Sequence, residues 1–77
     1  MKYTEATANK ILEVAKELHR TGRTSASTGE RIAAAFVINQ MEYLPEGYSV
    51  LEAWERLEPS WQRITKALHK AYGHKYP

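Results

Sequence analysis

The sequence predicts an all-α fold: a compact single-domain bundle of four helices over residues 1–77, with the second helix at its centre. Three observations predict it. Apolar residues recur at three- and four-residue spacing, and no segment shows the sustained polar–apolar alternation of a strand. All nine acidic residues are glutamate, the better helix former, and none is aspartate, which favours caps and turns. Glycine and proline fall mostly between the periodic segments.

The length and the lack of cysteine limit what can stabilise this fold. A domain of 77 residues buries only about 60% of the surface that its unfolded chain exposes, so its stability is marginal. The chain has no cysteine, which excludes disulfides and zinc sites of the cysteine type. We therefore expect stability to come from helix packing, from a partner subunit, or from both. The 43% hydrophobic and 26% charged residues are typical of a globular protein.

Helical spacing predicts the first helix at residues 4–20. Its apolar residues recur every three or four positions and form one stripe, which consists of Ala8, Ile11, Leu12, Ala15 and Leu18. Gly22 follows and is expected to end the helix. The loop after it, residues 21–27, is short and rich in threonine, serine and arginine.

The second helix is predicted at residues 28–43. Ser27 and Glu30 have capping-box spacing, in which each side chain accepts a hydrogen bond from the backbone N–H of the other residue. The seven residues 32–38 are all apolar. A helix that is apolar on every side is buried on every side, so this one is expected to be central.

Asn39 falls on the same side as Phe36. We expect its amide to be buried and hydrogen-bonded to a loop carbonyl, the alternative being that this side meets another chain.

The third helix is predicted at residues 50–57. Pro45 and Gly47 mark the turn before it, and Ser49 with Glu52 repeats the capping-box spacing. One apolar face is expected to meet the core, and it consists of Val50, Leu51, Trp54 and Leu57.

The fourth helix is predicted at residues 59–72. Pro59 suits the first helical position because proline lacks an N–H that would go unused there. Gly73 suits the C′ position that follows a helix. Residues 73–77 are then a short C-terminal tail. The apolar stripe of this helix consists of Trp61, Ile64, Leu68, Ala71 and Tyr72.

Charge is polarised across the Glu58–Pro59 step. Residues 42–58 hold five glutamates and one arginine, a formal charge of −4. Residues 59–77 hold four basic side chains and no acidic one, a formal charge of +4, although the whole chain has only +2. Such adjacent patches allow two copies to associate, because the acidic segment of one can face the basic segment of the other.

The basic residues of the fourth helix form one stripe. At 100° per residue they lie close together around the helix, and they are Arg63, Lys66, Lys70 and His74. The stripe can be a ridge for nucleic-acid phosphates, with Tyr76 stacking on bases, or for an acidic protein surface. The favoured interpretation is simpler. An amphipathic helix needs a solvated face, and cations near its C-terminus suit the helix dipole.

The loop at residues 21–27, together with Arg20 and Arg23, is a second candidate for binding. Amides at a helix start bind anions, and arginine adds bidentate contacts. The loop lacks the Gly-Lys-Ser/Thr ending of a P-loop. The capping-box spacing favours a plain connector. A helix-turn-helix is disfavoured because Glu52 and Glu55 of the third helix would face DNA phosphates.

Catalysis and metal binding have few candidate residues. The chain lacks both cysteine and aspartate. His69 and His74 are five residues apart, which separates them by about 140° around a helix, so they are not a natural metal pair. The roles of an active site cannot be filled from what remains. We therefore predict no catalytic, cofactor-binding or metal-binding residue.

The expected location is the cytoplasm. The longest apolar run has seven residues, against the roughly 20 that a membrane span needs. The first residues also lack the apolar core of a secretory leader.

The expected function is that of a small, non-enzymatic binding or regulatory module that acts through protein–protein contacts, with self-association as one form. Aromatic richness supports this, because tryptophan and tyrosine are enriched at interface hot spots. The tryptophans and tyrosines of the chain include Tyr43, Tyr48, Trp54, Trp61, Tyr72 and Tyr76. The alternative is a nucleic-acid-binding protein that uses the basic fourth helix and the loop arginines, through Arg20, Arg23, Arg63, Lys66 and Lys70.

Overall fold

The computed structural model describes residues 2–73 and contains four α-helices and one 3-10 turn over that range. The elements are α1 (Lys2–Thr21), α2 (Thr28–Val37), η1 (Met41–Tyr43), α3 (Val50–Arg56) and α4 (Pro59–Tyr72). No strand occurs among these described residues. The predicted all-α class with four helices is confirmed.

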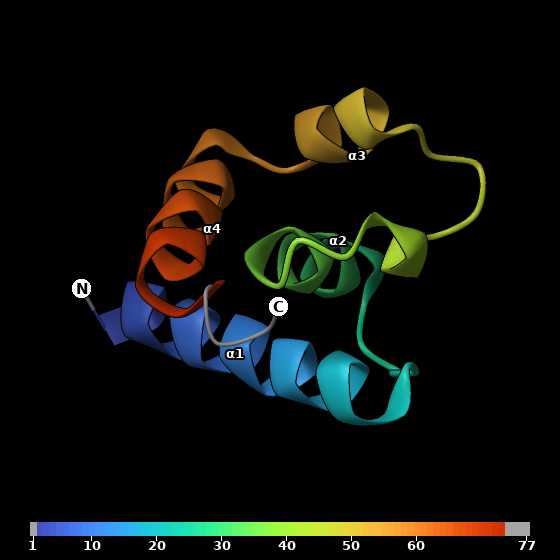
Figure 1. The fold of residues 1–77 in the computed structure, drawn as a ribbon. Coiled ribbons are helices and arrows are strands. Elements are labelled where there is room, and N and C mark those ends of the chain that lie inside the picture. The colour runs from blue at the N-terminus through green and yellow to red at the C-terminus, as the bar shows by residue number, and fades with distance from the viewer. Residues whose placement is uncertain (1, 74–77) are drawn as a thin grey trace.

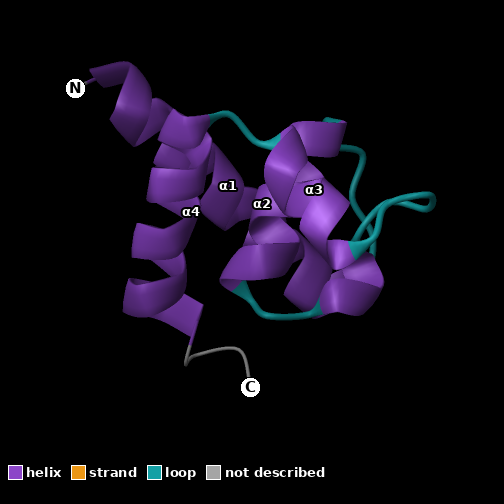
Figure 2. Ribbon diagram, turned by 90° about the horizontal axis from the view of Figure 1, so that it is seen from above, coloured by secondary structure: helices purple, strands orange, loops and turns teal. Residues whose placement is uncertain are grey.

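Helix α2 lies at the centre, as predicted. In Figure 1, α1 runs along one side, α3 lies on the opposite side, and α2 lies between them, with α4 closing one end. The view from above shows α3 lying over α2 (Figure 2). Helix α2 packs against α1, α4, α3 and η1. This arrangement follows from its composition, because only a helix that is apolar around its girth can be covered from several sides.

The core is built mainly from α1 and α2. Residues 32–35 of α2 are completely buried, and so are Val37 and Ile38. Helix α1 contributes Ile11, Val14, Ala15 and Leu18, while the second half of the chain contributes Ala53, Leu57 and Leu68. The three alanines of α2 leave room for close approach of its neighbours, which suits a helix in the middle of a small bundle.

Local signals set most helix boundaries. The Ser27 hydroxyl accepts a hydrogen bond from the Glu30 N–H at 3.3 Å, and the Glu30 carboxylate accepts one from the Ser27 N–H at 3.1 Å. Ser49 and Glu52 make the same reciprocal pair, both at 3.1 Å. Both capping boxes are therefore confirmed. Pro59 begins α4 as predicted.

The prediction that the second helix runs to residue 43 is wrong. Helix α2 ends at Val37, because Asn39 adopts a left-handed conformation with φ 57°. The Asn39 N–H donates to the Phe36 carbonyl at 3.2 Å, and the Gln40 N–H donates to the Ala35 carbonyl at 3.0 Å. This is the Schellman arrangement, in which asparagine is one of the few residues that tolerates the left-handed position. Asn39 is consequently exposed, and the expectation of a buried amide is also wrong.

Two further expectations need correction. Val50 and Leu51 were expected on the core-facing side of the third helix, but in the first turn of α3 they are 50% and 67% exposed. Gly73 was expected at the C′ position, which is often left-handed, but it is the C-cap of α4 and has a right-handed φ of −57°. A Cβ at Gly73 would lie 2.9 Å from His69 Nδ1 and 3.0 Å from the Val37 carbonyl oxygen. Glycine is needed there for close approach.

Candidate interaction surface

The corner between α3 and α4 forms a candidate interaction surface. Leu57 and Glu58 are both extended and together join the two helices. The Gln62 side chain donates from Nε2 to the Trp54 carbonyl at 2.9 Å, and the buried Leu57 anchors the corner to the core. These contacts hold α3 beside α4. We call the outer surface of the two helices the α3–α4 face.

A groove opens on this face between α3, α4 and the end of α2. It has a volume of about 210 Å³ and is lined by Phe36, Asn39, Trp54, Thr65, Lys66 and His69; we call it the Trp54 groove. The Phe36 and Trp54 rings meet edge to face, with centroids 5.1 Å apart and planes at 77°. The Lys66 ammonium lies 5.8 Å from the Trp54 ring centroid, within cation–π range. The groove thus combines aromatic walls with a basic edge.

Two polar side chains of the groove differ in how their hydrogen bonds are satisfied. His69 Nδ1 lies 3.1 Å from both the Phe36 and the Val37 carbonyl oxygens. Because carbonyl oxygens only accept, Nδ1 donates, and α4 thereby supplies a donor to the last carbonyls of α2, of which that of Phe36 also accepts from the Asn39 N–H. Thr65 is only 1% exposed, and its hydroxyl has no hydrogen-bond partner among the described residues.

Exposed apolar side chains lie beside the groove. Val50 and Leu51 stand four and three residues before Trp54, so they are its neighbours on the surface of α3. Together with Tyr72, they are the exposed large hydrophobic side chains among residues 5–73, whose side chains the structure describes. The apolar surface therefore continues from the groove onto the first turn of α3.

The flanks of the α3–α4 face carry opposite charges. On α3, Glu52 and Glu55 are exposed. On α4, Arg63, Lys66 and Lys70 are exposed on the side away from the buried Leu68, as the sequence predicts. Hydrogen bonds from the backbone and side chain of Ser49 lower the pKa of Glu52 below its ordinary value. Among residues 2–73, none of these carboxylates forms an ion pair with these bases.

The predicted binding residues do not come together in one place. Arg20 and Arg23 are exposed at the end of α1 and in the loop that follows it. This loop lies at the end of the molecule away from α4 in both views (Figures 1 and 2). His74 and Tyr76 lie outside the described residues. The loop arginines and the basic stripe of α4 are therefore two separate surfaces.

The loop at residues 21–27 uses its hydroxyl groups internally. Thr21 donates to the Glu17 carbonyl at 2.9 Å, and Thr24 donates to the Glu17 carboxylate. The Ala26 N–H donates to the Thr24 hydroxyl at 3.1 Å. The hollow beside this loop is lined by carboxylates, Glu17 and Glu30 among them, as well as by Arg20. These contacts favour the connector interpretation over anion binding.

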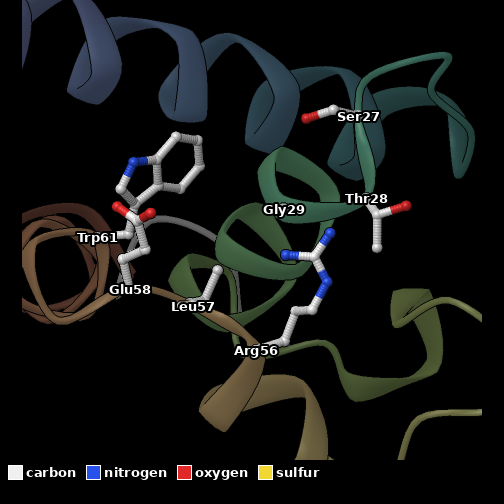
Figure 3. Close-up of a pocket in the computed structure, with 7 residues that line it drawn as sticks. All are labelled: Ser27, Thr28, Gly29, Arg56, Leu57, Glu58 and Trp61. Carbon is white, nitrogen blue, oxygen red and sulfur yellow. The ribbon is translucent and has the colours of Figure 1, made fainter.

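A second hollow, not predicted from sequence, lies at the start of α2 (Figure 3). It has a volume of about 490 Å³ and is lined by Ser27, Thr28, Gly29, Arg56, Leu57, Glu58 and Trp61. In Figure 3 the Arg56 guanidinium lies beside Gly29 and Thr28, while the Glu58 carboxylate lies beside Trp61. Since Arg56 and Glu58 carry opposite charges, the hollow has no single electrostatic preference.

Within residues 2–73, no group of three histidine or acidic side chains is placed to hold a metal ion. No helix in the same range is long and apolar enough to cross a membrane.

No protein-family model, curated protein or solved structure matches this chain.

Proposed function

We propose that this protein is a non-enzymatic binding module whose partner is a protein, and that it binds through the α3–α4 face. The observation that carries the proposal is the exposure of Val50 and Leu51, at 50% and 67%, next to the Trp54 groove. Burying one such side chain is worth about 1.5–3 kcal/mol. A marginally stable domain that leaves two adjacent ones exposed keeps that free energy available for binding.

The composition of the face supports a protein partner. Interface hot spots are enriched in tryptophan and are surrounded by polar rims. Trp54 is half-buried at the centre of the face, with Leu51 on one side and Lys66 on the other. A protein surface supplies both the apolar side chains and the charges that such a face can receive.

The lowered pKa of Glu52 favours a role in binding over a role as a general acid. A general acid at neutral pH needs a pKa raised by burial or by like charges. The Ser49 hydrogen bonds shift the pKa of Glu52 in the opposite direction. Its role is to cap α3, and it is exposed on a solvated helix side rather than held in a closed pocket.

A photo-crosslinking experiment tests the proposal. A benzophenone amino acid replaces Leu51, which preserves the apolar character of the site, and it replaces the exposed Lys16 of α1 as the matched control. After irradiation in cells that express the chain, we expect a discrete protein adduct from position 51 and none from position 16. Adding Val50→Glu to the position-51 probe should abolish the adduct.

Three results would overturn the proposal. The first is equal labelling from both positions, and the second is no adduct from position 51. The third is an adduct that disappears with nuclease treatment, which would favour the nucleic-acid alternative.

A further inference from the structure

The α3–α4 face has its charges and its apolar surface in a definite order. At 100° per residue, Leu51 lies between Trp54 and Glu55 around α3, and the core-facing Ala53 and Leu57 lie on the other side of Trp54. Across the groove, Lys66 is the base of α4 that lies by Trp54, and Lys70 and then Arg63 lie further around that helix. The face therefore runs from acidic, through apolar, to basic.

This order is what a self-complementary surface requires. In a two-fold dimer the same patch meets itself, turned by 180°. The turn places the acidic flank of one protomer over the basic flank of the other, while the apolar centre stays over the apolar centre. A partner with one uniform charge would be attracted electrostatically by one flank and repelled by the other.

We infer that the partner on the α3–α4 face is a second copy of this chain, bound about a two-fold axis that passes through the apolar centre formed by Val50, Leu51 and Trp54. The inference rests on the proposed function, since it names the occupant of the same face. Helix α3 of each protomer lies beside α4 of the other. Glu55 of one protomer then faces the bases Lys70 and Arg63 of the second.

The charges and the size of the molecule agree with this occupant. Glu55, Arg63 and Lys70 have no ion-pair partner among the side chains of residues 5–73, so each can pair across the interface. A stable interface buries roughly 800 Å² on each partner. That is about a sixth of the 5101 Å² that the chain exposes, a share that a face made of two helices can supply.

Charge exchange between the flanks gives the decisive test. One variant, Glu52→Gln/Glu55→Lys, makes both flanks basic, and glutamine keeps the capping box of α3. The other, Arg63→Glu/Lys70→Glu, makes both flanks acidic. The control, Lys10→Glu/Lys16→Glu, makes a comparable change on exposed residues of α1.

Sedimentation equilibrium at low salt measures the mass of each purified chain, with circular dichroism to confirm that it is folded. We expect the wild type and the control to reach twice the 8.8 kDa chain mass at high micromolar concentration. Each flank variant should dimerise at least about tenfold more weakly. A mixture of the two variants should recover the dimer, and so should one chain that carries all four substitutions.

The outcomes separate the two proposals. A wild type that stays at 8.8 kDa overturns the two-fold dimer. An adduct from position 51 with a different protein would then leave the binding module standing. A dimer that neither flank variant weakens also overturns the inference, because another surface must hold it. If the wild type is monomeric and position 51 gives no adduct, both proposals fail.

Discussion

Where α1 meets α2, apolar side chains are buried completely, whereas α3 leaves two of its apolar side chains in solvent. Ile11, Leu18 and Ile32 have no exposed surface, while Val50 and Leu51 are at least half exposed. Polar groups differ in the same way. The Thr21 and Thr24 hydroxyls at the end of α1 and in the loop after it have hydrogen-bond partners, but the Thr65 hydroxyl beside the Trp54 groove has none among the described residues. The difference separates the part of the molecule that stabilises the fold from the part that is available for contact.

The largest expected effect tests the contrast directly. Ile32→Ala removes a completely buried side chain from the central helix and should lower the free energy of unfolding by about 2–5 kcal/mol. Leu51→Ala removes an exposed one and should change it by less than about 0.5 kcal/mol. Urea unfolding followed by circular dichroism, at a protein concentration low enough to keep the chain monomeric, measures both. Equal losses for the two variants would contradict the contrast.

Gly73→Ala should destabilise the fold by about 1–3 kcal/mol through steric overlap. The added Cβ would lie 2.9 Å from His69 Nδ1 and 3.0 Å from the Val37 carbonyl oxygen, so the end of α4 must move away from α2. Ala71→Ser, on the exposed side of the same helix, is the matched control and should change stability by less than about 0.5 kcal/mol. Thermal unfolding compares the two variants. A Gly73→Ala protein as stable as its control would show that α4 and the end of α2 leave room for a Cβ at Gly73.

Thr65→Val should stabilise the protein by about 1 kcal/mol. The two side chains have nearly the same shape, and the change removes a buried hydroxyl that has no hydrogen-bond partner. Thr7→Val, on α1, is the comparison, because Thr7 is half-exposed and makes an interaction within the fold. Urea unfolding should show a gain only at position 65. If Thr65→Val lowers stability instead, the Thr65 hydroxyl has a hydrogen-bond partner in solution.

The smallest expected effect concerns the capping box of α3. Its hydrogen bonds lower the folded-state pKa of Glu52 from 4.5. The stabilisation is therefore present above pH 4.5 and is lost as the pH falls through the lowered pKa. Ser49→Ala keeps the larger cause, the hydrogen bond from the Ser49 backbone N–H, and removes only the contribution of the Ser49 side chain. The pKa of Glu52 should therefore move part of the way back towards 4.5, as measured by NMR titration of its side-chain carboxyl group. The same variant should leave the capping box at Ser27 intact, and an unchanged pKa of Glu52 would contradict the assigned cause.

Features that depend on neighbours in the sequence could be predicted, and those that depend on distant residues could not. Both capping boxes and the start of α4 at Pro59 are local, and they were correct. The end of α2 depends on the left-handed Asn39 and on His69, which reaches back from α4 to donate to the Phe36 and Val37 carbonyls. Apolar spacing alone cannot reveal either contact.

The same limit applies to the candidate surface. The charge contrast between α3 and α4 is visible in the sequence because charged side chains stay exposed almost wherever they fall. The Trp54 groove is not visible, because it needs Phe36 of α2 beside Trp54 of α3. Helical periodicity places Val50 on the core side of α3, but whether anything covers that side is a property of the tertiary structure.

The contact between His69 and the end of α2 also decides the chemical character of the groove. Because Nδ1 must donate to the Phe36 and Val37 carbonyls, the fold selects the Nδ1–H tautomer of the neutral imidazole. A side chain entering the Trp54 groove therefore meets an imidazole ring that the backbone of α2 holds in one orientation.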